Sequence, residues 1–414
     1  MRMGAIVSRL SETLTKKKNV LTILALLLAF PLLSPSRYYM ILLAEVLIWA
    51  LLAMSYDLTL GYTGLVSFGH AAMFGIGAYA SAILLRLDLN FGLAILVAML
   101  FGALIGFTFG ILTLRVSGIY YALVTLAVAE VIFAVFSKWV DLSGGETGLS
   151  VPRPDLLRSD LLLYAALIIF VIVTIVMIIT VVRDLAKKGS KKTRIIQSVL
   201  LIAFIALLIY LAPSRLTLIS EGSLRERSTT IQSMNIYYFL ALIPLIISYF
   251  AANRIVNSPV GRIFVAIREN EERTRMVGYN VFRYKLISSI FSGIFAGLAG
   301  ALYAPFVLSV NPANVMSSSV MINVLLYSIL GGLGTLFGPM IGAAIITLLA
   351  SELTGLPYVG EYWMLVLGIF YLIVIMFLPY GIVITWKIRG ASFRKTLRKL
   401  FESIRKSSTK VVDQ

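Results

Sequence analysis

The sequence predicts an all-α bundle of about ten or eleven membrane-spanning helices. Of the 414 residues, 59% are hydrophobic and only 13% are charged, too few charges to cover the surface of a soluble domain of this size. Apolar runs of about 17 residues or more recur along the chain, each long enough to cross a hydrocarbon core about 30 Å thick. Glycine-rich breaks interrupt two of the spans, at 61–77 and 331–342.

The apolar runs divide the chain into three parts. We expect a basic N-terminal segment at 1–19, a transmembrane domain at 20–385 and a basic tail at 386–414. The predicted spans are, in chain order, 20–33, 40–60, 71–85, 91–114, 119–137, 161–182, 195–212, 236–252, 286–307, the split pair 321–332 and 338–350, and 362–384.

The distribution of basic residues predicts how the spans are oriented. The tract 183–194 carries six Lys or Arg against one Asp, and 254–285 carries seven Lys or Arg against three Glu. Cytoplasmic loops are enriched in Lys and Arg, so we place both tracts and both chain termini in the cytoplasm. The stretch 309–319 has no charge, and 138–160 and 351–361 are not basic. We expect these three stretches to face outward.

Two pairs of spans are expected to turn back within the membrane. The spans 321–332 and 338–350 each contain about 12 residues, or about 18 Å of helix, which is too short to cross alone. We therefore expect this pair to enter and leave on the outer face, with 331–338 near the inner turn. The same path suits 40–60 and 71–85 around the first break, so the two pairs form a parallel repeat rather than an inverted one.

The two breaks share a sequence pattern in which two glycines precede Phe-Gly: Gly61, Gly64, Phe68 and Gly69 in the first, and Gly331, Gly334, Phe337 and Gly338 in the second. Irregular backbone at membrane depth is tolerated where it lines a cavity or is buried in protein, and corresponding breaks in two halves of a chain are typical of transport pathways. The alternative is ordinary helix packing through small residues. The candidate pathway residues are Gly61, Gly64, Ser67, Phe68, Gly69, His70, Glu130, Gly331, Gly332, Gly334 and Gly338.

Three carboxylates, Glu45, Asp57 and Glu130, fall within or near spans. A charge at membrane depth costs about 2.5–3.5 kcal/mol on insertion scales, so each needs a partner or a function. Glu130 lies near mid-depth and is the strongest candidate for a proton or substrate site, the alternative being a hydrogen bond between helices. Asp57 is expected to satisfy backbone N–H groups freed by the first break. His70 is expected to hydrogen-bond loose carbonyls, with substrate contact as the alternative.

Several kinds of chemistry are excluded by the residue inventory. The sequence has no cysteine and one histidine, which argues against metal and redox sites. The net charge of +17 does not indicate nucleic-acid binding, because the basic residues lie in loops between spans. No Gly-Lys dipeptide occurs, so the chain has no Walker A loop for ATP, and we expect it to bind no cofactor itself.

The stretch 253–285 resembles a docking element rather than a simple connecting loop. Ser258 and Pro259 give an N-cap and a first helical residue, and an apolar i, i+3, i+4, i+7 pattern follows. Asn270 can cap a second short helix that ends at Gly278, a residue suited to the left-handed conformation. Two capped helices this small need a partner surface. The alternative is a solvated charged loop.

Four segments together resemble branched-chain amino-acid ABC transporter permeases of the LivM type: 258–303, GLVSFGHAAMFGIGAYASA at the first break, LGGLGTLFGPMIGAA at the second, and SGGETGL at 143–149. The resemblance implies that the second short helix is a coupling helix that sits in a groove of a cytoplasmic ATPase. Arg273 and Thr274 stand where the family usually has alanines, and 161–212 is an additional hairpin. The implied coupling residues are Arg268, Glu269, Glu271, Glu272 and Gly278.

The function implied by this resemblance is that of a permease subunit of an ATP-driven importer in the cytoplasmic membrane. Expected partners are a homologous permease subunit in a heterodimer, two ATP-binding cassette subunits that hold ATP and Mg²⁺, and an extracytoplasmic solute-binding protein. The expected solute is a branched-chain or other neutral amino acid.

Four other functions are weaker alternatives. One is a simple-sugar permease of the same superfamily, and another is an ion-coupled secondary carrier that uses Glu130 with Glu45 or Asp57. An intramembrane enzyme is a further alternative, but the sequence offers few side chains suited to catalysis. A structural scaffold would leave the matched breaks unexplained.

Overall fold

The computed structural model describes residues 37–112, 116, 118–154, 225–356, 360–378 and 381–385. The predicted segments 1–19, 20–33, 161–182, 195–212 and 386–414 lie outside the described residues. In the first half the elements are α3 (Arg37–Asp57), the π-helix η1 (Leu58–Thr63), α4 (His70–Arg86), α5 (Phe91–Leu112), α6 (Ile119–Lys138), α7 (Val140–Ser143), η2 (Gly145–Thr147) and β1 (Leu149–Ser150). In the second half they are α10 (Arg225–Val256), α11 (Pro259–Glu269), α12 (Glu271–Met276), α13 (Val281–Val307), β2 (Ser309–Val310), α14 (Pro312–Val315), α15 (Ser318–Gly331), α16 (Phe337–Gly355), η4 (Gly360–Tyr362) and α17 (Trp363–Phe377).

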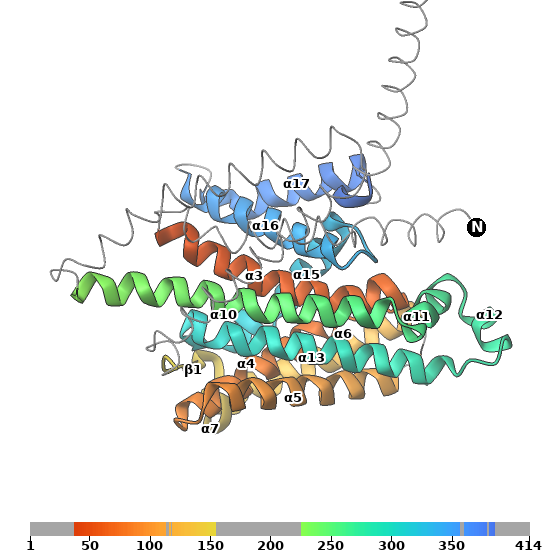
Figure 1. The fold of residues 1–414 in the computed structure, drawn as a ribbon, viewed down its shortest axis with the longest axis horizontal. Helices are drawn as coiled ribbons and strands as arrows, with labels where there is room; N and C mark the ends of the chain where they lie inside the picture. Colours follow the sequence, from red (N-terminus) through yellow and green to blue (C-terminus); the bar gives the residue numbers. More distant parts are fainter. Residues whose placement is uncertain are drawn as a thin grey trace, which may run out of the picture.

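The long helices run along one axis, as expected for an all-α membrane bundle (Figure 1). By length and composition, seven helical segments among the described residues could cross a membrane. Most of the predicted spans agree with a helix to within a few residues. The predicted total of ten or eleven depends partly on segments outside this range, so it stays a prediction.

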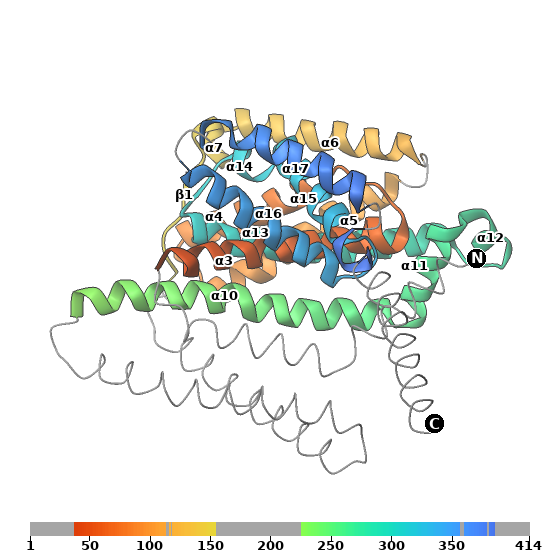
Figure 2. The ribbon, with the colours of Figure 1, turned by 90° about the horizontal axis from the view of Figure 1, so that it is seen from above.

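The two ends of the bundle differ in a way that matches the charge pattern. The helices α11 and α12 project from one end, and α7 and β1 lie at the other (Figure 2). At that second end β1 and β2 pair antiparallel, with Leu149 opposite Val310 and Ser150 opposite Ser309. The uncharged stretch 309–319 and residues 138–154, the described part of 138–160, therefore meet at the end opposite the basic loop, as the sequence predicts.

The split pair near the C-terminus is longer than predicted. The helix α15 has 14 residues, but α16 has 19, or about 28 Å of helix. The prediction that both segments are about 12 residues long is therefore wrong for α16. The prediction placed the end of the helix at the end of the apolar run. In the structure, the helix continues through polar residues such as Glu352 to Gly355.

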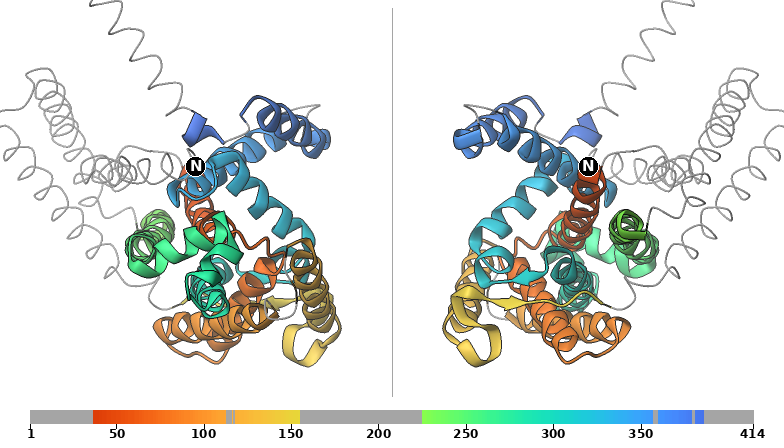
Figure 3. Two further views of the ribbon diagram at one scale, coloured as in Figure 1. Left: turned by 90° about the vertical axis from the view of Figure 1, so that its right-hand side faces the viewer. Right: turned by 90° about the vertical axis from the view of Figure 1, so that its left-hand side faces the viewer.

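Close packing in the middle of the bundle depends on small residues on α13. End-on views show how α4, α5 and α10 lie around α13, with α6 at the edge (Figure 3). A Cβ added to Gly102 of α5 would lie 2.9 Å from the Gly297 Cα of α13, and one added to Gly77 of α4 would lie 2.6 Å from the same atom. Helix backbones in membranes approach closely where residues are small. Gly297 thus sets the spacing of three helices.

Replacing Gly297 with valine is expected to destabilise the bundle by about 1–3 kcal/mol, because the added side chain forces α4 and α5 away from α13. Thermal unfolding in detergent measures the change. Gly368→Val is the matched control, since nothing lies within 4 Å of a Cβ added to that α17 residue. Equal melting temperatures for the two variants would contradict this account of the packing.

Candidate functional site: two helix breaks and a capped loop

Both glycine-rich breaks are present, and both are narrower than predicted. The first comprises residues 64–69, between η1 and α4, and the second comprises 332–336, between α15 and α16. Gly64 and Gly334, which correspond in the sequence pattern, both have φ of +77°, a conformation that glycine adopts readily. The first break follows a π-helix, a feature found frequently at functional sites.

Asp57, at the end of α3 directly before η1, joins the first broken span to the second break. Its Oδ1 accepts a hydrogen bond from the Gly334 N–H at 2.7 Å, and its Oδ2 accepts from the N–H groups of Thr335 at 3.1 Å and Leu336 at 2.8 Å. The side chain is fully buried. Asp57 accepts hydrogen bonds from freed backbone N–H groups, as predicted. These N–H groups belong to the second break, 277 residues along the chain, and not to the first.

Glycine at position 61 makes this contact possible. A Cβ added to Gly61 would lie 2.5 Å from the Gly334 backbone nitrogen and would collide with Asp57 Oδ1. At the second break, a Cβ added to Gly331 would lie 2.7 Å from the Pro339 nitrogen and would collide with the Gly338 carbonyl. These glycines are therefore required for close approach of the chain to itself.

Arg268, near the end of α11, contacts both breaks. Its guanidinium Nη1 donates to the Gly61 carbonyl oxygen. A Cβ added to Gly64 would lie 3.1 Å from Arg268 Cγ, and one added to Gly334 would lie 2.7 Å from Arg268 Nη1. We call the group formed by Asp57, Gly61, Arg268 and residues 334–336 the break junction. Because it touches α11, both broken pairs turn at the α11 end, as the parallel repeat predicts.

His70 lies within a polar layer between η1 and α13. It is fully buried, and its Nε2 lies 2.5 Å from Ser292 Oγ and 3.4 Å from Thr59 Oγ1. In the same layer Thr63 and Ser288 hydroxyls are 2.7 Å apart. This placement favours a hydrogen-bonding role for His70 over contact with a solute.

The other polar candidates tie α6 to its neighbours. Glu130 is exposed on α6 and accepts a hydrogen bond from the Ser318 hydroxyl at the start of α15. The Phe68 N–H donates to Thr125 Oγ1 of α6 at 3.0 Å, and Ser67 is buried with its hydroxyl accepting from Gly69 at 3.2 Å. The helix α6 is thus joined to the first break and to α15.

The three intramembrane carboxylates are not gathered on one element. Glu45 accepts a hydrogen bond from Trp49 Nε1 at 3.2 Å and lies 12 residues before Asp57 on α3, about 18 Å along the helix. Glu130 lies on a different helix. In the part of the chain that the structure describes, no group of three or more His, Cys, Asp or Glu side chains could hold a metal ion.

The capped loop has the predicted local structure. The Ser258 hydroxyl accepts from the Gly261 N–H at 3.4 Å at the start of α11, and Asn270 Oδ1 accepts from the Arg273 N–H at 2.8 Å at the start of α12. Gly278 follows α12 with φ of +97°. The apolar face of α11 is directed into the bundle, with Phe264 and Ile267 buried. The predicted caps and apolar face are confirmed.

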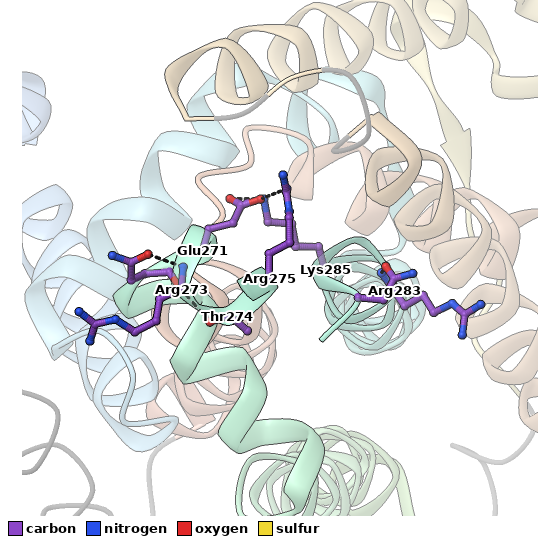
Figure 4. Close-up of polar contacts among 8 residues, drawn as sticks. Glu271, Arg273, Thr274, Arg275, Arg283 and Lys285 are labelled. Atoms are coloured by element: carbon purple, nitrogen blue, oxygen red, sulfur yellow. Dashed lines mark hydrogen bonds and ion pairs between the residues drawn. The ribbon is translucent and has the colours of Figure 1, made fainter. Parts of the chain in front are cut away.

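Glu271 forms an internal ion pair that the sequence does not reveal. It accepts from Lys285 Nζ of α13 at 2.7 Å and from Arg275 at 3.3 Å (Figure 4). The Lys285 side chain is only 5% exposed. Glu271 therefore holds α12 against the base of α13.

The most exposed part of the loop is apolar. Met276 is 85% exposed, Val277 70% and Tyr279 45%. We call these three residues the apolar tip. This surface was not predicted from the sequence, because the prediction considered only the caps and the charged residues of the second short helix. The signal in the sequence is the apolar pair Met276-Val277 directly before Gly278, at the end of that charged helix.

Comparisons with known proteins give a consistent result. The model of the family "Branched-chain amino acid transport system / permease component" matches residues 38–186 and 162–375. The high-affinity branched-chain amino acid transport system permease protein LivM of Escherichia coli is 27% identical over 373 residues, covering 90% of this chain and 76% of the relative. LivM of Salmonella typhimurium is 26% identical over 380 residues, with the same two shares. The ribose import permease protein RbsC of Haemophilus influenzae is 29% identical over 126 residues, or 29% of this chain and 38% of the relative. No solved structure matches the chain.

Proposed function

This chain belongs to the branched-chain amino acid transport permease family, and we propose that it is the membrane-spanning subunit of an ATP-driven ABC importer for branched-chain or other neutral amino acids. The observation that carries the proposal is the family match, which covers nearly all of the described bundle, and its LivM relatives are transport permeases. The chain is a multi-pass cell-membrane protein and a transport subunit rather than an enzyme. The charge pattern supports a cytoplasmic position for both termini.

The apolar tip is the part of the capped loop best suited to dock an ATPase subunit. Met276 and Val277 are largely exposed, and the exposed carboxylate of Glu272 lies one helical turn before Met276 on α12. An apolar centre with a polar rim is the usual anatomy of a protein interface. ATP and Mg²⁺ are bound on the two ATPase subunits. Glu271 supports this surface from behind through its ion pair.

The internal role of Glu271 gives a charge-swap prediction. Glu271→Lys is expected to lower the stability of α12 on α13 by about 2 kcal/mol and to release most of the ATPase, because Lys285 is left buried beside a like charge. Adding Lys285→Glu restores the pair and should restore ATPase binding, as measured by co-purification. Glu352→Lys, at an exposed position on α16 outside the capped loop, is the matched control. A double variant that binds no better than Glu271→Lys contradicts the internal pair.

The translocation pathway is formed with a second, homologous permease subunit and receives the solute from an extracytoplasmic binding protein. In the state described, Gly61 of η1, the first-break residues Ser67 and Gly69 and the side chain of His70 are buried. We place the moving hinge at the breaks and the solute on the α6 side, where Glu130 and Ser318 are exposed. Few intramembrane charges suit a zwitterionic or neutral solute, and the binding protein supplies most of the selectivity.

Uptake into proteoliposomes tests the proposed substrate and energy source. The complex, reconstituted with its ATPase subunits and binding protein, should take up labelled leucine only when ATP is present inside, and excess ribose should not compete. Competition by ribose would favour the sugar-permease alternative, which a partial match to a ribose permease keeps open. Uptake driven by an ion gradient without ATP would favour the secondary carrier.

A further inference from the structure

We infer that Arg268 is a positioning residue that links the docking loop mechanically to both broken spans, acting through Asp57. The inference rests on the proposed function, because it assumes that an ATPase moves the loop. The contact chain is continuous. Arg268 on α11 donates to the Gly61 carbonyl, Gly61 packs against the Asp57 carboxylate, and Asp57 accepts three N–H groups of the second break.

The junction differs from the rest of the α11 contact with the bundle. Phe264 and Ile267 make apolar contacts, which are not directional and allow one helix to slide on another. The Arg268 bond to a carbonyl oxygen is directional and charge-assisted, as are the three bonds to the Asp57 carboxylate. Directional bonds resist sliding, so a displacement of α11 is passed to the first break through Arg268.

Asp57 makes the two breaks move as one body. Two of its bonds, from Gly334 and Leu336, are 2.7 and 2.8 Å long and are buried, a setting in which such bonds are strong. A buried carboxylate at membrane depth is costly unless it is fully paired, so its position needs a reason. Joining η1 to the loop before α16 supplies one. A single push on α11 then moves both broken spans.

Glycines keep the space around the Arg268 side chain clear. Gly64 and Gly334 both face it, and a Cβ added to Gly64 would lie 3.1 Å from Arg268 Cγ and one added to Gly334 would lie 2.7 Å from Arg268 Nη1. The glycines that the two breaks share in their sequence pattern therefore have the same role beside Arg268. Each break presents a glycine to the same arginine side chain, Gly64 to its aliphatic part and Gly334 to its guanidinium group.

The test compares uptake with ATP hydrolysis in the reconstituted full complex. For Arg268→Ala we expect ATP hydrolysis to continue while leucine taken up per ATP falls about tenfold, the size of a typical coupling between sites. Arg268→Lys should recover part of the ratio, and Arg262→Ala, at an exposed position on the same helix, should leave it unchanged. A proportional fall in uptake and hydrolysis would overturn the inference.

A double variant tests whether the two residues act together. If Arg268 acts through Asp57, Arg268→Ala with Asp57→Asn should lower the ratio no further than the worse single variant. Additive losses would overturn the inference.

A distance measurement gives a readout that a purely structural role would not change. The natural chain has no cysteine, so spin labels can be placed at Ala266→Cys on α11 and Leu333→Cys in the second break. In the parent, the label distance should stay constant when ATP is added, because the two sites move together, and in Arg268→Ala it should become ATP-dependent. An ATP-dependent distance in the parent overturns the inference. If the parent complex retains no ATPase, the proposed function itself has failed.

Discussion

Gly61→Leu is expected to reduce solute uptake to background while the chain still inserts into the membrane. The leucine side chain would occupy the positions of Asp57 Oδ1 and the Gly334 backbone nitrogen. The two breaks would separate, and the Asp57 carboxylate and three backbone N–H groups would lose their partners in a buried setting, where each unpaired polar group costs about 1–3 kcal/mol. Gly334→Leu should have the same effect, since a Cβ there would lie 2.7 Å from Arg268 Nη1 and 3.0 Å from the Gly61 carbonyl oxygen, and the residue has a φ of +77° that leucine rarely adopts.

Uptake in vesicles with equal amounts of inserted protein measures this prediction. Gly368→Leu is the matched control, because α17 offers open space at that position and the substitution adds the same apolar side chain to a membrane helix. If Gly61→Leu and Gly368→Leu transport equally well, the breaks only pack helices and the pathway hypothesis is wrong.

Met276→Asp combined with Val277→Asp is expected to detach the ATPase and stop ATP-driven uptake. The two side chains are 85% and 70% exposed in the isolated chain, so the substitutions should leave the fold of the bundle intact. Placing two carboxylates in the apolar centre of an interface removes contacts of the kind that contribute about 2–4 kcal/mol each at hot spots. Loss of both therefore lowers the affinity beyond what the remaining rim contacts can support.

The measurement is the amount of ATPase that co-purifies with the tagged chain. Leu87→Asp is a suitable control, because it introduces a charge at an exposed leucine that follows α4, away from the loop. Full ATPase retention by the double variant would move the docking surface away from the apolar tip.

The local features of the capped loop could be predicted from sequence because their determinants lie within a few residues. Ser258, Asn270 and Gly278 each act on the nearest helical turn, and the structure confirms all three. The Glu271 ion pair could not be predicted, because Lys285 lies 14 residues away and reaches it only through the path of the chain into α13.

The break junction depends on long-range contacts, which could not be predicted from one sequence. Sequence pattern identified both breaks and the need of Asp57 for backbone donors. It assigned those donors to the nearer break, because nothing in one sequence places Asp57 next to a segment 277 residues away. The residue types alone also do not distinguish a side chain that lines a solute pathway from one that packs between helices. His70 is polar enough for a solute site, yet Ser292 and Thr59 occupy its surroundings.

The proposed function requires that a separate ATPase drives this subunit. Mass spectrometry of the complex purified in mild detergent from its native membrane tests this most directly. We predict that the unmodified chain brings down a homologous permease subunit and an ATPase that carries a Walker A motif, and that the Met276→Asp, Val277→Asp variant loses the ATPase alone. A stable complex without any ATPase, from a membrane in which leucine uptake follows an ion gradient, would contradict the account.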